Sequence, residues 1–193
     1  TDAYVSDDCR SMAAVTLGQE SSVFVSNVVI YALDAQEPKA NYSVQNGLEV
    51  AIRQIGDALV TVSDTCLTAG SFSGGVTQTY SYAGEYLREY SLDGDGYAVL
   101  LLNRYQSGSV GRLVTVDAKG EQMAQLDVQS EILSVSAAGR YIAVLYADRL
   151  VIYNPDLKEY ASLTGTEFAK DVLMRTDGSA LLVSSENARV FVP

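Results

Sequence analysis

Residues 134–144 read Ser-Val-Ser-Ala-Ala-Gly-Arg-Tyr-Ile-Ala-Val, which is the pattern of a strand, a tight turn and a second strand. The turn centres on Gly139, and glycine accepts the positive φ angles that tight turns require. Residues 5–15 match this stretch, with Cys9 in the place of Gly139. This strand–turn–strand unit decides the fold prediction because it recurs along the chain.

The recurring turn has five anchor residues: Cys9, Gly56, Gly96, Gly139 and Gly178. They are separated by 47, 40, 43 and 39 residues. A repeat of roughly 40–45 residues is typical of a four-stranded propeller blade. The sequence therefore predicts an all-β fold, a single β-propeller domain over residues 1–193 with about five four-stranded antiparallel blades. The repeat units cover about 1–46, 47–84, 85–128, 129–164 and 165–193.

The strands within each unit differ in polarity. The second strand is apolar on both faces, as in residues 97–101 and 141–145, so both sides must be covered, and neighbouring blades would cover them. The fourth strand is more polar and fits the solvent-exposed edge. Fourth strands are expected at residues 39–44, 76–83, 122–128 and 159–163, and long second-to-third hairpins at 17–24 and 103–111.

The two ends of the repeat do not decide how the blades close into a ring. Unit one begins directly on its first strand and unit five stops after its third, which gives 19 strands. Either five blades close into a ring with one short sheet, or the chain is most of a larger, seven-bladed ring whose first blades lie upstream. The second alternative is favoured because the sequence begins directly on the first strand of unit one.

Composition removes several classes of function. The 193 residues carry 24 acidic and 13 basic side chains, a formal net charge of −11, so nucleic acid is not an expected partner. The chain has no histidine. This excludes Ser–His–Asp and Cys–His nucleophile systems, because nothing in the chain is expected to titrate near neutrality, and it excludes histidine-containing metal and haem sites. The absence of tryptophan disfavours sugar stacking.

Membrane and targeting segments are not evident in the sequence. The longest purely apolar run, residues 97–102, has the length of a buried strand and is far shorter than a membrane span. Residues 1–8 have neither a basic region nor an apolar core. Any signal or anchor is therefore expected upstream of Thr1.

Residues 6–16, Ser-Asp-Asp-x-Arg-x-Met-Ala-Ala-Val-Thr, resemble the repeat of membrane-tethered, propeller-like proteins of Gram-positive bacteria. Residues 28–31, 57–64, 112–120 and 140–154 share this similarity to WD40-like and quinoprotein-like propellers. The resemblance implies an extracytoplasmic location and an amino-terminal membrane helix, and it implies no activity. The Trp-Asp dipeptide of WD40 blades and the tryptophan docking motif of quinone-binding propellers are both absent, so no cofactor is expected.

The string Asp93-Gly94-Asp95-Gly96 is the most site-like motif. Two carboxylates two residues apart could wrap a hard cation such as calcium, but a full calcium loop needs a glutamate at its twelfth position, which Arg104 occupies. The favoured alternative is a hairpin turn, because Asp and Gly tolerate positive φ. No metal site is predicted. Asp93 and Asp95 remain weak candidates for carboxylates at the mouth of a central channel.

Four tyrosines, Tyr80, Tyr82, Tyr86 and Tyr90, lie close together in the sequence. Exposed tyrosines make good partner contacts because they bury area with few rotors to freeze. Ordinary strand propensity explains the same residues and is favoured. This stretch is nevertheless the best sequence-based candidate for a contact surface.

Cys9 and Cys66 are expected to remain separate thiols. In the repeat frame they lie at turns on opposite faces of a propeller, beyond the roughly 7 Å that a disulfide allows between Cα atoms.

A carboxylate pair could support hydrolase or lyase chemistry without histidine. Candidates are the turn residues Asp7, Asp8, Asp93, Asp95 and Asp177, for which simple solvation is the favoured explanation. The leading hypothesis is a non-enzymatic, extracytoplasmic platform that binds a protein or another cell-envelope partner. The alternatives are a carboxylate-dependent carbohydrate-active enzyme and a sensor domain that binds a small ligand.

Overall fold

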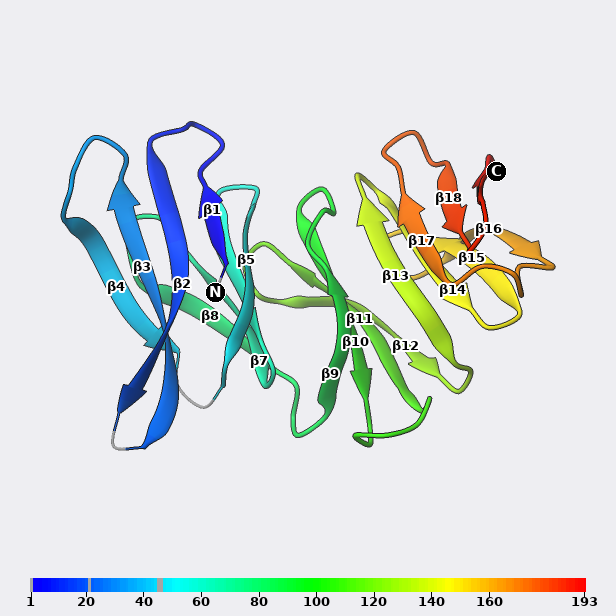
Figure 1. The fold of residues 1–193 in the computed structure, drawn as a ribbon, viewed down its shortest axis with the longest axis horizontal. Helices are drawn as coiled ribbons and strands as arrows, with labels where there is room; N and C mark the ends of the chain where they lie inside the picture. The colour runs from blue at the N-terminus through cyan, green and yellow to red at the C-terminus, as the bar shows by residue number, and fades with distance from the viewer. Residues whose placement is uncertain (1, 21, 45–46) are drawn as a thin grey trace. The chain divides into compact units, whose positions relative to one another are not determined.

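A computed structural model of the chain describes residues 2–20, 22–44 and 47–193. The described residues form five antiparallel sheets that follow one another along the sequence, which we number as blades 1 to 5 (Figure 1). No helix occurs among them, and none is therefore available to span a bilayer. The predicted all-β class is confirmed.

The strands of each blade pair in chain order, so every blade is a simple meander. Blade 1 contains β1 (Ala3–Val5), β2 (Ser11–Glu20), β3 (Val23–Ala32) and β4 (Pro38–Val44). Blade 2 contains β5 (Glu49–Ile55), β6 (Ala58–Ser63), β7 (Cys66–Gly70) and β8 (Val76–Ser81). Blade 3 contains β9 (Tyr86–Ser91), β10 (Tyr97–Asn103), β11 (Gly111–Asp117) and β12 (Gln122–Val128). Blade 4 contains β13 (Ile132–Ala138), β14 (Tyr141–Tyr146), β15 (Arg149–Tyr153) and β16 (Glu159–Thr164), and blade 5 contains β17 (Asp171–Met174), β18 (Ala180–Val183) and β19 (Ala188–Phe191).

All five turn anchors have a positive φ angle. The angles are 55° at Cys9, 58° at Gly56, 82° at Gly96, 56° at Gly139 and 88° at Gly178. This is the left-handed region that glycine enters without a steric penalty. The repeat read from the sequence therefore corresponds to a shared backbone geometry, and Cys9 adopts it in spite of its Cβ.

Burial follows the position of a strand within its blade. Every residue of β10 is buried, and β6 and β14 are buried except for their first residues. The fourth strands β8, β12 and β16 are mostly exposed. The expected contrast between apolar second strands and polar fourth strands is confirmed.

The chain divides into two compact units, each described here by itself. Unit 1 consists of Thr1–Gly84 with Ala118–Glu121, and unit 2 consists of Glu85–Asp117 with Gln122–Pro193. Unit 1 thus holds blades 1 and 2, and unit 2 holds blades 3 to 5. The single-domain organisation over residues 1–193 stays a prediction.

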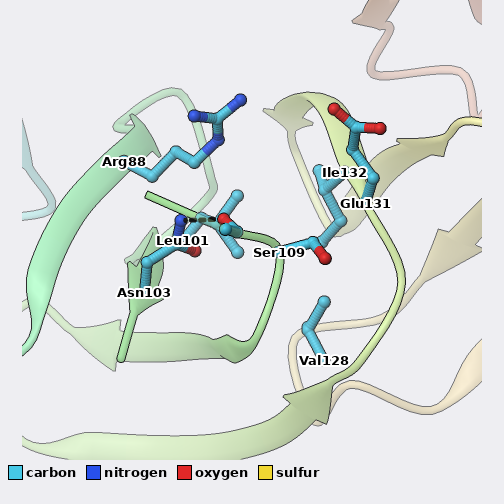
Figure 2. A pocket seen from close by; sticks show the side chains of 8 residues that line it. Arg88, Leu101, Asn103, Ser109, Val128, Glu131 and Ile132 are labelled. Carbon is cyan, nitrogen blue, oxygen red and sulfur yellow. Dashed lines mark hydrogen bonds between the residues drawn. The ribbon is translucent and has the colours of Figure 1, made fainter. Parts of the chain in front are cut away.

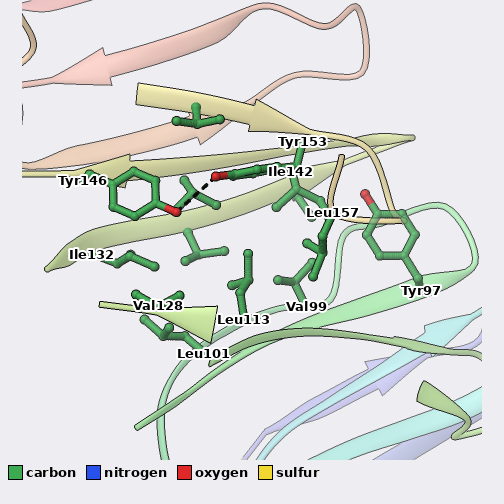
Figure 3. Packing of buried hydrophobic residues seen from close by; sticks show 14 residues of the cluster. Tyr97, Val99, Leu101, Leu113, Val128, Ile132, Ile142, Tyr146, Tyr153 and Leu157 are labelled. Carbon is green, nitrogen blue, oxygen red and sulfur yellow. Dashed lines mark hydrogen bonds between the residues drawn. The ribbon is translucent and has the colours of Figure 1, made fainter. Parts of the chain in front are cut away.

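Facing blades within a unit are joined by apolar layers. In unit 1, Val15 and Val28 of blade 1 belong to the same buried cluster as Ile52 and Leu59 of blade 2. In unit 2, one cluster unites blades 3 and 4 around residues such as Leu113 and Ile142 (Figure 3). A second cluster unites blades 4 and 5. Each blade face therefore becomes core only when the next blade packs on it.

Hydrogen bonds from the first strand of one blade to the preceding blade accompany this packing. In each, a backbone N–H donates to a side chain of the preceding blade. The donor lies four positions before its own turn anchor. The three pairs are Ile52 to Asp2 Oδ2 at 3.1 Å, Val135 to Glu89 Oε1 at 3.0 Å, and Met174 to Ser136 Oγ at 3.0 Å. The donor is therefore the amide at the same position of the repeat in all three blades, whereas the accepting side chain differs.

The hairpin predicted at residues 17–24 is present and consists largely of paired strand. β2 continues to Glu20 and β3 begins at Val23, with the pairing Glu20 to Val23 at the end. The second predicted hairpin agrees with the structure, because β10 ends at Asn103 and β11 begins at Gly111.

Candidate functional site

A strand irregularity places Arg88 on the surface of unit 2. The register between β9 and β10 shifts at Leu101 and Leu102, whose partners are Glu89 and Leu87, so Arg88 is an extra residue between them. A β-bulge of this kind bends the strand and re-aims the side chain. The exposed guanidinium of Arg88 lines a recess.

We call this cavity the Arg88 recess. It has a volume of about 280 Å³ and is formed by β9, the ends of β10 and β12, the connection from β10 to β11, and the start of blade 4. Its lining residues are Arg88, Leu101, Asn103, Gly108, Ser109, Val128, Glu131 and Ile132 (Figure 2). All of them belong to unit 2.

The floor of the Arg88 recess is apolar with one amide. Leu101, Val128 and Ile132 are buried, and so is Asn103. The Nδ2 atom of Asn103 donates to the carbonyl oxygen of Gly108 at 2.9 Å, which ties the loop to the end of β10. The side-chain oxygen of Asn103 has no partner among the described residues, so it remains available as an acceptor.

Opposite charges flank this floor. Figure 2 shows Arg88 on one side of the recess and Glu131 on the other. Both side chains are exposed, and neither forms an ion pair or a side-chain hydrogen bond with any described residue. The charge of Arg88 acts on the nearby Glu89 carboxyl, but neither Arg88 nor Glu131 is held in an ion pair, so the recess offers one cation and one carboxylate that make no direct polar contact of their own.

A smaller recess of about 180 Å³ adjoins Val128. Two of its charged residues are already paired: Arg112 Nε contacts Glu85 Oε2 at 2.5 Å, and Arg112 Nη1 also donates to Gln125 Oε1 at 3.1 Å. Arg104 and Asp127 also line the smaller recess, so the Arg88 recess is preferred for its larger volume and its buried apolar floor.

The predicted tyrosine surface is divided in the structure. Tyr80 and Tyr82 lie in unit 1 with ring centroids 6.3 Å apart, whereas Tyr86 and Tyr90 belong to unit 2. Tyr82 is fully buried, so its ring is not presented to a partner. Tyr86 is 47% exposed and Tyr90 is half-buried. Burial removes Tyr82 from the predicted contact surface, and a contact role for Tyr80, Tyr86 and Tyr90 stays a prediction.

The Asp93-Gly94-Asp95-Gly96 string forms a turn that touches the next blade. Gly94 and Gly139 form an isolated bridge, and the Asp95 N–H donates to the Gly139 carbonyl at 2.8 Å. A Cβ at Gly94 would lie 2.6 Å from the Tyr97 carbonyl oxygen, which explains the glycine by packing. Both carboxylates lie at exposed positions. Among the residues that the structure describes, no three His, Cys, Asp or Glu side chains are grouped as metal ligands would be.

Two other candidate carboxylates stabilise turns. Asp8 accepts hydrogen bonds from the Ser6 hydroxyl at 2.6 Å and the Arg10 N–H at 3.0 Å, and these bonds hold the pKa of Asp8 below its ordinary value. Asp177 accepts from the hydroxyl and the N–H of Ser179, with the same effect on its pKa. A lowered pKa suits an ionised acceptor rather than a general acid. Asp7 accepts from the Tyr4 hydroxyl at 3.0 Å.

Both cysteines are free, as predicted. Cys9 is exposed and Cys66 is buried.

A buried carboxyl in unit 1 corrects one expectation. Glu49 is only 7% exposed, and neither carboxylate oxygen has a hydrogen-bond partner among the described residues. Burial, with a contribution from the negative charge of Asp64, raises the pKa of Glu49 to about 7. The expectation that nothing in this histidine-free chain titrates near neutrality is therefore wrong, because burial disfavours the charged carboxylate.

Two tyrosines share this environment with Glu49. Burial, followed by the charge of Glu49, raises the pKa of Tyr42 to about 12. Burial raises the pKa of Tyr82 as well. The hydroxyl groups of both are buried and lack partners within the described part of the chain. The group is a polar layer inside unit 1 rather than a solvent-accessible site.

The end of the β2–β3 hairpin carries exposed apolar side chains. Leu17 is 54% exposed, Val23 is 64% exposed and Phe24 is 61% exposed, and we call these three residues the apolar tip. β1 pairs with β2 only at residues 12–14, and β4 pairs with β3 only from Ser26 onward. The tip therefore extends past both neighbouring strands (Figure 1).

Sequence reasoning missed Arg88, Glu131 and the apolar tip. The long hairpin at 103–111 was a usable signal for one wall of the Arg88 recess. A one-residue bulge leaves no mark in composition or periodicity, so Arg88 could not be singled out.

Comparisons with known proteins support the fold. No family model and no curated protein sequence matches the chain. Among solved structures, the C-terminal WD40 domain of Sif2 is similar with a TM-score of 0.65 and 14% identity, over 100% of this chain and 69% of that chain. The complex of KlAtg21 with the coiled coil of AgAtg16 is similar with a TM-score of 0.64 and 11% identity, over 100% of this chain and 80% of that chain. BBS1N in complex with ARL6DN is similar with a TM-score of 0.57 and 12% identity, over 98% of this chain and 71% of that chain.

These similarities, together with the five meander sheets, show a β-propeller fold of the WD40-like kind. Sequence identities this low carry information about the fold alone. Fold does not determine activity, because one fold hosts many functions.

Proposed function

We propose that this protein is a non-enzymatic platform for protein interaction or assembly. Two of the similar structures are complexes: KlAtg21 with the coiled coil of AgAtg16, and BBS1N with ARL6DN. This supports a binding role for the same fold here. We also propose that the protein works outside the cytoplasm and is tethered to the membrane, as in the Gram-positive proteins that its turns resemble.

The apolar tip carries the proposal. Leu17 and Phe24 lie on one face of the hairpin, because the register pairs Leu17 with Ser26 and Gln19 with Phe24. Exposed apolar side chains that cluster on a projecting element mark interaction surfaces. The chain keeps this cluster outside its own core, so a partner protein of the cell envelope is its proposed occupant.

The test is capture of partners from cell envelopes with the chain as bait. The wild type is expected to enrich a protein that a Leu17→Ser/Phe24→Ser variant no longer enriches. Leu173→Ser is the matched control, since Leu173 is also exposed (51%) but lies in blade 5. Equal enrichment by the double variant, or no enrichment together with turnover of a glycan or ester library, would contradict the platform.

Location is tested separately by protease treatment of intact cells and by fractionation. We expect the protein in the membrane fraction and cleavage by added protease without lysis. Recovery in the cytosolic fraction would contradict the proposed location and leave the capture experiment unaffected.

A further inference from the structure

The Arg88 recess brings together two opposite charges that form no ion pair with any described residue. Most other arginines of unit 2 are engaged: Arg112 pairs with Glu85, Arg149 with Asp148, and Arg189 stacks on the Phe168 ring at 4.4 Å. Arg88 has no such contact with any described residue. Its charge favours the carboxylate form of Glu89 without a direct contact, so the guanidinium remains available to a ligand.

The bulge at Arg88 has counterparts that show what is unusual about it. The first strands of blades 2 and 4 shift register in the same way, and the extra residues there are Val50 and Leu133. Both are apolar and exposed, at 47% and 36%. Blade 3 alone among these three blades places a guanidinium at the bulge, and the residues around it form a cavity.

Glu131 is held at the opposite wall by its backbone. The Ala147 N–H donates to the Glu131 carbonyl oxygen at 3.2 Å, which ties the connection between β12 and β13 to the end of β14. This hydrogen bond fixes the backbone from which the Glu131 side chain extends. Between the two charges, Leu101, Val128 and Ile132 provide an apolar floor, and Asn103 provides an acceptor.

The geometry points to a zwitterionic small molecule as the ligand of the Arg88 recess, specifically a free α-amino acid with an aliphatic side chain. Its carboxylate pairs with the Arg88 guanidinium, whose planar fork matches a carboxylate. Its ammonium group pairs with Glu131 and the Asn103 side-chain oxygen. Its aliphatic side chain covers Leu101, Val128 and Ile132.

Size and charge narrow the ligand class. A cavity of about 280 Å³ lies just under the roughly 300–1,000 Å³ of sites for drug-sized ligands, so a smaller molecule suits it. A simple anion would meet the like charge of Glu131, and a simple cation that of Arg88. Only a ligand with both charges satisfies both walls. This inference does not depend on the apolar tip or on a protein partner.

Calorimetric titration of the chain with three probes tests the inference. The probes are L-leucine, leucinamide, which lacks the carboxylate, and 4-methylpentanoate, which lacks the ammonium group. We expect leucine to bind and each single-charge analogue to bind at least about tenfold more weakly, because each loses one charge-assisted interaction. Arg88→Gln and Glu131→Gln should each weaken leucine binding by a similar factor.

The matched controls are Arg104→Gln and Asp127→Asn, which remove charges that line only the smaller recess. They should leave leucine binding unchanged. No heat of binding with leucine at millimolar concentration, equal binding of 4-methylpentanoate, or unchanged binding by Arg88→Gln would each overturn the inference. Since Arg88 and Glu131 are exposed and lack partners in the described chain, both variants should fold, which thermal melting verifies.

Discussion

The side chain of Glu89 and the backbone of Val135 join the first strands of blades 3 and 4: Glu89 Oε1 accepts the Val135 N–H at 3.0 Å. Ser91 Oγ, two residues further along β9, accepts the Ala137 N–H at 2.9 Å. The free edge of β13 is therefore capped by side chains of the preceding blade. Such capping matters because an unpaired amide at a buried strand edge is costly.

Replacing Glu89 should reveal the value of this contact. Glu89→Ala leaves the Val135 N–H without its acceptor and should lower the free energy of unfolding by about 1–3 kcal/mol. Glu89→Gln keeps an oxygen at the same place and should cost less. Urea denaturation of the two variants measures the difference, and equal losses would show that the hydrogen bond contributes nothing.

Glu49 should make stability depend on pH in a defined direction. Its pKa is raised from 4.5 to about 7 in the folded chain, so the folded state retains a proton that the unfolded state has released. The stabilisation is fully present below about pH 4.5 and is lost as pH rises through about 7. Relative to Glu49→Gln, the wild type should lose on the order of 3 kcal/mol between pH 4.5 and pH 8.

The measurement is urea denaturation of both proteins at several pH values. Comparison with Glu49→Gln cancels the titration of other groups, such as Asp8 and Asp177, whose lowered pKa values act at acidic pH. Parallel stability curves for the two proteins would contradict a near-neutral titration of Glu49.

Tyr146 and Tyr153 form a buried hydroxyl pair. Their oxygen atoms lie 3.1 Å apart within the core between blades 3 and 4 (Figure 3). Tyr153→Phe leaves the Tyr146 hydroxyl buried without this partner and should cost about 1–3 kcal/mol. The double variant with Tyr146→Phe should cost less than the sum of the single changes. Strict additivity in this double-mutant cycle would mean that the pair is not coupled.

The shared turn geometry predicts opposite effects at equivalent anchors. Cys9 adopts φ 55° with a Cβ, so Cys9→Gly removes backbone strain and should stabilise the chain by up to about 1 kcal/mol. Gly139→Ala introduces that strain and should destabilise it by about 1–2 kcal/mol. The added Cβ would lie 3.7 Å from its nearest neighbours, which are atoms of Thr176, so the effect comes from φ. Thermal unfolding measures both, and effects of the same sign would contradict this explanation.

The two thiols should differ in reactivity. Exposed Cys9 should react with Ellman's reagent in the native protein, whereas buried Cys66 should react only after denaturation. We therefore expect one fast thiol in buffer and both thiols in denaturant without reductant. A missing thiol in denaturant would indicate a disulfide.

Local chemistry explains why much of the fold could be predicted. The anchors could be found because positive φ selects glycine, and Cys9 was recognised through its flanking residues. The fourth strands could be found because β8, β12 and β16 are mostly exposed to solvent, and exposed strand positions favour polar side chains. Both signals depend on a residue and its immediate surroundings, which the sequence contains directly.

The candidate site was harder to predict because it depends on tertiary packing. Tyr82 follows the end of β8 and is buried, although its neighbours in the sequence suggest an exposed strand. Glu49 has an ordinary acidic side chain, and only its burial changes its titration. Arg88 owes its position to a register shift of one residue, which no hydrophobic pattern records.

The bulges at Val50, Arg88 and Leu133 offer a route for protein engineering. A residue that is extra in the ladder can be exchanged without breaking strand pairing, and these three are also exposed. Grafting arginine or another recognition side chain onto Val50 or Leu133 would give a different blade a new specificity while its scaffold remains intact. The three bulges are thus equivalent positions for surface substitution, and only the bulge of blade 3 carries a charged residue in this sequence.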